Sequence, residues 1–200
     1  MRRLTALLLA GTLLLSLTGC GAEETADRAA AVREKYAAPA SYRAVAEVEI
    51  VREDGDMRCT LRLDGGGEET KVTVLSPEAL AGVSAHLSGD GLKLEYDGAV
   101  LDAGGAVQGL SAANCVPLTL RAVAEGCLLE QNEESFGEEE RALRLCCESE
   151  ASGRTLSYTV WFAPDCTPLY AEIAENGSAA AFMEFTDFAF CDIISSDGAQ

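Results

Sequence analysis

Two residues near the middle of the chain have side chains that could support nucleophilic catalysis. Ser84 and His86 stand two positions apart in the stretch Gly82-Val83-Ser84-Ala85-His86, which partly matches the turn that presents a catalytic serine in hydrolases. The match fails at its fifth position, where that turn needs glycine and this chain has His86. The stretch also alternates like a strand, which would place both side chains on the outer, polar face. We therefore predict that the protein is not an enzyme.

Acidic residues are numerous, but their spacing does not predict a metal or phosphate site. The stretch 53–56 (Glu-Asp-Gly-Asp) lacks the spacing of a calcium loop and fits a hairpin. The stretch 64–67 (Asp-Gly-Gly-Gly) is a turn, because the Lys-Ser or Lys-Thr of a phosphate-binding loop does not follow it. The run 133–140 reads as a solvated acidic loop. We predict neither a metal nor a cofactor.

One cysteine occupies a position that predicts chemistry. Arg2-Arg3 precede an apolar run from Leu4 to Leu15, which is the pattern of an export signal and is short for a membrane span. The segment Leu17-Thr18-Gly19-Cys20 that follows resembles the lipobox of bacterial lipoproteins. The resemblance implies that residues 1–19 are a signal peptide and that Cys20 carries lipid, palmitate included. The chain would then be anchored on the extracytoplasmic face of the cell membrane. An ordinary secretory signal that contains a cysteine is the alternative.

The other cysteines do not define a disulfide pattern. Their number is odd once Cys20 is lipidated, so they cannot all pair within the chain. No C-x-x-C motif occurs, and a single histidine makes a Cys/His zinc site a poor interpretation. We assign no pairing among these seven residues: Cys59, Cys115, Cys127, Cys146, Cys147, Cys166 and Cys191.

The chain is strongly acidic, which limits its partners. Its formal net charge is -18, and loss of the two arginines in residues 1–19 makes it -20. A protein of this charge without a basic stripe is not expected to bind nucleic acid or to adhere electrostatically to anionic lipid. Contact with a membrane would depend on the lipid at Cys20.

The elements that would position any site are mostly strands. Apolar residues alternate with polar ones in many short segments, which predicts roughly nine to eleven strands. Asp-Gly and Asn-Gly pairs, such as Asp97-Gly98 and Asn176-Gly177, predict tight hairpins and an antiparallel meander. Helices are predicted at 23–37, 77–81 and 117–125. The segments with strand alternation are 44–51, 57–64, 70–75, 83–88, 92–97, 141–148, 155–162, 168–174 and 179–190.

These elements predict one mainly β domain. We expect residues 20–38 to form a lipidated tether and an N-terminal helix, 39–192 a half-barrel, and 193–200 a flexible tail. A large antiparallel sheet with few helices must curl to cover its apolar face, and so forms an unclosed barrel with short helices on the concave side. The interior of such a barrel can hold a hydrophobic ligand. The residues expected to line this cavity are Val48, Ile50, Leu61, Leu63, Leu94, Val160 and Phe162.

Two segments carry a resemblance to a known superfamily. They are Val74-Leu75-Ser76-Pro77-Glu78-Ala79-Leu80-Ala81-Gly82 and Leu92-Lys93-Leu94-Glu95-Tyr96-Asp97-Gly98, joined by the late strand 155–162 with Pro164 and Pro168-Leu169. In this order they resemble the LolA/LolB-like lipoprotein carriers and receptors, nearest to the clostridial germination lipoprotein group GerS. The resemblance implies an unclosed barrel capped by helices that binds lipid inside or binds a partner protein.

Two functions follow as alternatives. The first is a membrane-anchored lipoprotein that binds a lipid or other hydrophobic ligand. The second is a packed β scaffold that recruits or activates an envelope enzyme, for example a peptidoglycan amidase in sporulation or germination. The aromatic residues of the last third fit core packing, a cavity wall or a docking patch. They are Tyr158, Trp161, Phe162, Phe182, Phe185, Phe188 and Phe190.

Overall fold

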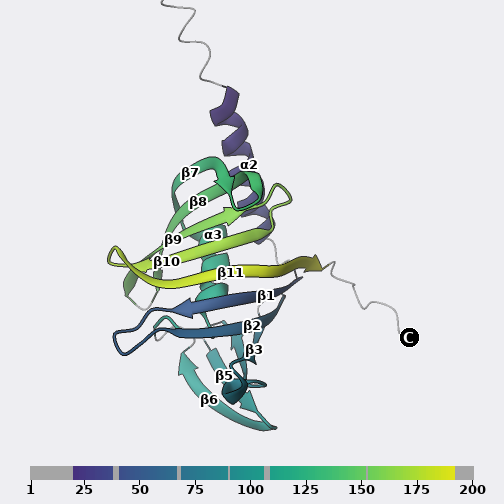
Figure 1. Ribbon diagram of the computed structural model, residues 1–200, viewed down its shortest axis with the longest axis vertical. Coiled ribbons are helices and arrows are strands. Elements are labelled where there is room, and N and C mark those ends of the chain that lie inside the picture. Colours follow the sequence, from purple (N-terminus) through teal and green to yellow (C-terminus); the bar gives the residue numbers. More distant parts are fainter. Residues whose placement is uncertain are drawn as a thin grey trace, which may run out of the picture.

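The computed structural model describes residues 20–37, 41–66, 69–89, 91–105, 109–151 and 153–191. The predicted signal peptide (1–19) and tail (193–200) lie outside these residues. The described chain forms one large antiparallel sheet with two α-helices and a single 3₁₀ turn (Figure 1). The predicted fold class, mainly β with a few helices, is confirmed.

The sheet has eleven strands in the order β6-β5-β4-β3-β2-β1-β11-β10-β9-β8-β7. It consists of two antiparallel meanders, β1 to β6 and β7 to β11, which are joined where β1 pairs with β11. The predicted meander and strand number are therefore confirmed. The strands are β1 (Ser41–Ile50), β2 (Met57–Gly66), β3 (Glu69–Ser76), β4 (Ser84–Ser88), β5 (Gly91–Tyr96), β6 (Ala99–Gly105), β7 (Cys127–Phe136), β8 (Glu139–Ala151), β9 (Arg154–Phe162), β10 (Pro168–Glu175) and β11 (Ser178–Cys191).

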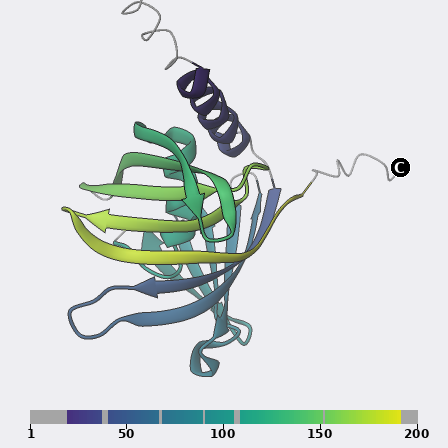
Figure 2. The same ribbon diagram turned by 45° about the horizontal axis from the view of Figure 1, so that its top comes forward.

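The sheet curls without closing. Figure 2 shows the strands curving around a helix on the concave side. β6 and β7 are the two edges of the sheet and do not pair with each other in the described residues. This is the unclosed barrel that the sequence predicted.

Alternating side chains explain which face of the sheet is covered. In β9, Leu156, Tyr158, Val160 and Phe162 are all at most 4 % exposed, while the residues between them are partly exposed. Because successive side chains of a strand point to opposite faces, the buried set faces the interior of the curl. Burial of this face is the main stabilising contribution to the fold.

The hairpins show the backbone geometry that their residues favour. Asp97 and Gly98 have φ values of 49° and 78°, and Asn176 and Gly177 have values of 52° and 78°. Two consecutive positive φ values match the twist of antiparallel strands, and glycine, aspartate and asparagine tolerate them best. Both predicted turns are therefore confirmed.

The helix on the concave side is α3 (Cys115–Glu125), which packs against β8, β9 and β10. Seven of its residues are buried, since its apolar face meets the inner face of the sheet. The helix ends at Gly126, where the backbone becomes extended. A Cβ at this position would collide with the carbonyl oxygens of Ala122 and Glu148, so the site requires glycine. The segment was predicted as a helix at 117–125, and the observed helix begins two residues earlier.

The second helix, α2 (Cys20–Ala37), packs against α3, β7 and β8. It includes Cys20 to Glu24, where the sequence suggested the start of a polar tether. Arg28 forms an ion pair with Glu133 of β7, and the Arg141 guanidinium lies 2.7 Å from the Glu24 carboxylate. These pairs cross from α2 to the β7–β8 hairpin and hold the helix against the domain.

Aromatic packing fixes the C-terminal end of α2. The Tyr36 ring lies 5.7 Å from that of Phe162, 6.2 Å from Phe188 and 5.4 Å from Phe190. Its hydroxyl donates a hydrogen bond of 3.0 Å to the Cys166 carbonyl. Burial raises the pKa of Tyr36, so the phenol remains protonated and continues to donate this bond.

The prediction of an acidic loop at 133–140 is wrong. The segment contains the end of β7, a turn of two residues and the start of β8. Its carboxylates have partners that the sequence did not indicate: Glu133 pairs with Arg28 and Arg141, and Glu134 accepts a hydrogen bond of 2.6 Å from Trp161. The predicted helix at 77–81 is a 3₁₀ turn, η1 (Glu78–Leu80), with no buried residue.

Candidate functional site

The expected ligand wall is the concave face of the sheet. The seven predicted cavity residues lie there together, in or against one apolar cluster that includes the buried side of α3. Leu94 is half-buried. The other six are at most 3 % exposed: Val48, Ile50, Leu61, Leu63, Val160 and Phe162.

One row of paired residues shows how the covering of this face changes along the sheet. The row runs across five strand pairs in the register Ala44↔Leu63↔Val72↔Ala85↔Leu94↔Leu101, from β1 to β6. Leu63 is fully buried, Ala85 is 5 % exposed, and Leu101 is 64 % exposed. The apolar concave face is therefore covered at β1 to β4 and open at the β6 edge.

The position of α3 accounts for this gradient. The helix packs against β8, β9 and β10, on the half of the sheet that ends at β7. The inner side chains of β5 and β6 lie on the opposite half, beyond the strands that share the core with α3. Leu101 thus extends the apolar wall to the open edge.

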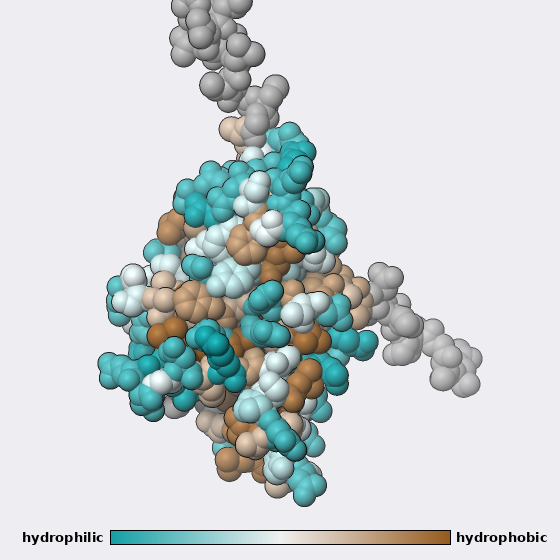
Figure 3. All heavy atoms as spheres, in the orientation of Figure 1, coloured by the Kyte–Doolittle hydropathy of each residue, from teal (hydrophilic) through white to brown (hydrophobic). Residues whose placement is uncertain are grey.

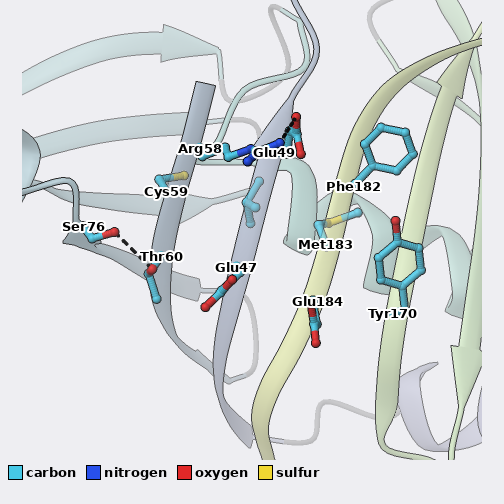
Figure 4. A pocket seen from close by; sticks show the side chains of 11 residues that line it. Glu47, Glu49, Arg58, Cys59, Thr60, Ser76, Tyr170, Phe182, Met183 and Glu184 are labelled. Carbon is cyan, nitrogen blue, oxygen red and sulfur yellow. Dashed lines mark hydrogen bonds and ion pairs between the residues drawn. The ribbon is translucent and has the colours of Figure 1, made fainter. Parts of the chain in front are cut away.

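A second candidate site lies on the opposite, convex face, where the sequence predicted none. Figure 3 shows this face of the molecule, with hydrophilic and hydrophobic side chains interspersed. A groove of about 470 Å³ crosses β3, β2, β1, β11 and β10 (Figure 4). The lining residues that are at least partly exposed are Glu47, Glu49, Arg58, Thr60, Ser76, Tyr170, Phe182 and Glu184. Val48, Cys59 and Met183 also border the groove, but they are buried in the core cluster of the concave face.

The groove is predominantly acidic. Glu49 forms an ion pair of 3.1 Å with Arg58 on the neighbouring strand. Glu47 of β1 lies directly opposite Glu184 of β11 in the strand register. Neither of these two carboxylates has an ion-pair partner in the part of the chain that the structure describes.

Aromatic rings form one side of the groove. Burial raises the pKa of Tyr170, and the nearby carboxylates of Glu172, Glu184 and Glu49 raise it further. The Tyr170 ring lies 5.6 Å from that of Phe136 and 5.7 Å from that of Trp161. This packing holds the Tyr170 ring in place at the groove wall.

The strand pattern contained part of the signal for this groove. Glu47 and Glu49 alternate with buried residues within the predicted strand segment 44–51. The pairing of β1 with β11 brings Glu184 beside Glu47 across more than 130 residues of sequence, and no local pattern indicates that pairing.

The aromatic residues of the last third divide between the two faces. Phe162, Phe188 and Phe190 surround Tyr36 on the concave side. Trp161 stacks with Phe136 on the convex side, at a ring distance of 5.0 Å. Aromatic residues of the same segment therefore pack in the core on one face and form a partly exposed stack on the other.

The residues considered for catalysis have other partners. Ser84 is 5 % exposed, and its hydroxyl lies 3.1 Å from that of Thr73. His86 Nε2 lies 2.9 Å from a carboxylate oxygen of Glu95 on β5. The imidazole is thus directed to a neighbouring strand and the hydroxyl to another, so the pair does not form a nucleophile and its base.

The seven described cysteine thiols are free, and those of Cys59, Cys115 and Cys147 are buried. Burial raises the pKa of Cys115 to about 12 and that of Cys147 to about 11. No group of three or more histidine, cysteine or acidic residues in the described segments could hold a metal ion. None of the helices described here is long and apolar enough to cross a membrane. The side chain of Cys20 lies outside the described structure.

Comparisons with known proteins give structural neighbours only. No family model matches the chain, and no curated protein matches its sequence. An uncharacterized conserved protein from Thermus thermophilus is similar at a TM-score of 0.50, with 15 % identity over 86 % of this chain and 88 % of that one. This match shows a shared fold.

Two further solved structures are similar to this chain at lower TM-scores. A LolA superfamily protein from Nitrosomonas europaea has a TM-score of 0.46 and 12 % identity, over 82 % of this chain and 94 % of that one. A chain of the complex between the CwlD amidase and the GerS lipoprotein from Clostridioides difficile has a TM-score of 0.39 and 18 % identity, over 75 % and 86 %. A LolA superfamily protein and a chain of a GerS complex are thus among the structures to which this chain is similar.

Proposed function

We propose that this chain is a membrane-anchored, extracytoplasmic lipoprotein that binds a lipid or other hydrophobic ligand on the concave side of its sheet. The observation that carries the proposal is the apolar row that is buried at Leu63 and 64 % exposed at Leu101. If this apolar face served folding alone, covering its exposed edge with the chain's own residues would make the fold more stable. A ligand that entered at β6 would cover it instead.

The energetics favour an acyl chain or a similar apolar group. Each methylene removed from water contributes about 0.8 kcal/mol, so a chain that covered Leu94 and Leu101 would gain from its own burial and from theirs. The seven concave residues predicted from the sequence would form or support the wall. Leu94 is the one among them nearest to the open edge.

Mass spectrometry of the protein purified from membranes in mild detergent would test the ligand directly. We expect copurified lipid, and we expect Leu101→Lys to reduce its amount because the charge would lie on the entry path. Val100→Lys is the matched control, since Val100 is 65 % exposed on the opposite face of the same strand. Both variants should melt like the parent protein. Absence of lipid from the parent protein, or equal lipid content in all three, would refute the proposal.

The anchor is tested separately at Cys20. Its acylation would place about two or three chains on one residue, and more than one chain is needed for durable membrane attachment. We expect Cys20→Ser to move the protein from the membrane fraction to the soluble fraction. Metabolic labelling with palmitate should mark the parent protein and leave the variant unlabelled. A labelled Cys20→Ser variant would place the lipid elsewhere.

The second candidate is a scaffold that binds an envelope protein, such as a peptidoglycan amidase. The observation that favours it is the complete burial of Leu61, Leu63 and Phe162 together with α3, which is how a packed core behaves. Affinity purification from crosslinked envelopes would support it if one protein were recovered in a 1:1 ratio while the lipid analysis stayed negative.

A further inference from the structure

We propose that the convex groove binds an extended, arginine-bearing segment of a partner polypeptide. The groove lies on the opposite face of the sheet from the concave ligand wall, so this proposal does not depend on the proposed function. Its occupant is inferred from the charges, rings and shape of the residues that line it.

The unpaired carboxylates are the first argument. Glu47 and Glu184 stand opposite each other on adjacent strands, where Cβ atoms are about 5 Å apart. Like charges at this spacing destabilise a sheet, and neither carboxylate has an ion-pair partner within the described residues. A cationic group supplied from outside would relieve the repulsion. The net charge of -18 would also attract a basic partner and repel an acidic one.

The groove already holds one guanidinium. Arg58 lies in it with its Nη2 3.1 Å from Glu49, and its side chain is 79 % exposed (Figure 4). The chain's own residue thus shows that an arginine fits beside Glu49. A second arginine, from a partner, would pair with Glu47 and Glu184. Glu47 lies two residues before Glu49 on β1, and neither carboxylate has an ion-pair partner within the described residues.

The aromatic wall favours arginine over lysine. Tyr170 is paired with Glu184 in the register, and Phe182 is paired with Glu49, so each ring is beside a carboxylate. A guanidinium stacks on an aromatic face and donates to carboxylates in its own plane, whereas an ammonium is a compact point charge. Because Trp161 and Phe136 hold the Tyr170 ring, little side-chain entropy would be lost on binding.

The shape of the groove favours a polypeptide over a small cation. The groove is open to solvent and crosses five strands, and its volume of about 470 Å³ is within the range of roughly 300–1,000 Å³ typical of ligand pockets. An open groove buries little of a small molecule. An extended peptide can place alternate side chains in it and gain affinity from several contacts.

Fluorescence anisotropy with a defined probe tests the proposal. The probe is a fluorescein-labelled octapeptide of alternating arginine and serine, titrated with the full chain purified in detergent. A peptide with citrulline in place of arginine is the neutral isostere. Trp161, the only tryptophan of the protein, lies beside Tyr170 and gives an independent reading of binding at this face.

Two double variants separate the groove from general acidity. Glu47→Gln/Glu184→Gln should bind the arginine peptide about tenfold more weakly. It should also melt about 1–3 °C higher, since a like-charge pair is removed. Glu53→Gln/Glu140→Gln changes the net charge equally at exposed positions outside the groove lining and should bind like the parent protein. Tyr170→Ala should weaken binding about fivefold, and Tyr170→Phe should preserve it.

The opposing results are equally definite. The proposal is overturned if the parent protein does not bind the arginine peptide, or binds the citrulline peptide equally well. It is overturned if the two double variants bind alike. Binding of free arginine amide as tightly as the octapeptide would assign the groove to a small cation and refute the polypeptide partner.

Discussion

Truncating leucines at the two ends of the concave row should have very different effects on stability. Leu63→Ala removes three carbons from a fully buried side chain, and Leu101→Ala removes them from one that is 64 % exposed. Transfer of three methylene-sized groups is worth about 2.4 kcal/mol when burial is complete. A void left at Leu63, between Ala44 and Val72, adds to that cost, so we expect a loss of about 3 kcal/mol. Scaled by its burial, Leu101→Ala should cost about 0.9 kcal/mol or less.

Urea denaturation followed by circular dichroism measures both losses. For a chain of this size, about 3 kcal/mol also lowers the melting temperature by roughly 6–12 °C, and about 0.9 kcal/mol by a few degrees. In protein freed of bound lipid, equal losses at the two positions would show that the chain itself covers the β6 edge, and would refute the open wall. A loss below about 1 kcal/mol at Leu63 would mean that its neighbours already form a hollow, because no packed contacts would then be lost.

Three other regions give predictions of their own. Arg28 hydrogen-bonds Glu133 and lowers the pKa of that carboxyl below the usual 4.5. This pair should therefore stabilise the fold above the ordinary pKa and lose its effect as acid protonates the carboxylate. From about pH 6 to about pH 3, the melting temperature of the parent protein should fall more steeply than that of Glu133→Gln. Iodoacetamide at about pH 8 should alkylate the exposed Cys127 and leave the buried Cys115 unmodified until urea unfolds the chain, as peptide mass mapping would show. Tyr36→Phe deletes a hydrogen bond to a backbone carbonyl between β9 and β10 and should cost about 1 kcal/mol in a urea titration, whereas an unchanged midpoint would mean that water replaces the bond.

The strands were predictable wherever one face of the sheet is apolar. Segments such as 57–64 and 155–162 alternate strictly, because their inner residues enter the core and their outer residues meet solvent. The strands β6 and β7 were missed for a physical reason. They are the edges of the sheet, so core burial imposes less alternation on them. The acidic run of β7 also resembles a loop until its ion pairs with α2 are known.

The two candidate sites differ in how far the sequence could indicate them. The concave residues were predicted because the alternation within each strand identifies its inner face. Leu61 or Val160 can therefore be assigned to that face without knowing which strand pairs with which. The convex groove depends on the register that places Glu47 opposite Glu184, and therefore on the pairing of the first strand with the last. The sequence contains no local signal for that pairing.

The continuous helix that starts at Cys20 has a consequence for how the domain would stand above a bilayer. Its 18 residues extend for about 27 Å, and it is fastened to the β7–β8 hairpin from Glu24 onward and to the sheet by Tyr36. An acyl group at its first residue would thus be attached to a rigid helix, with no flexible spacer between the lipid and the domain. The domain could then change its tilt relative to the membrane only together with this helix, so neighbouring proteins would contact a restricted set of its faces.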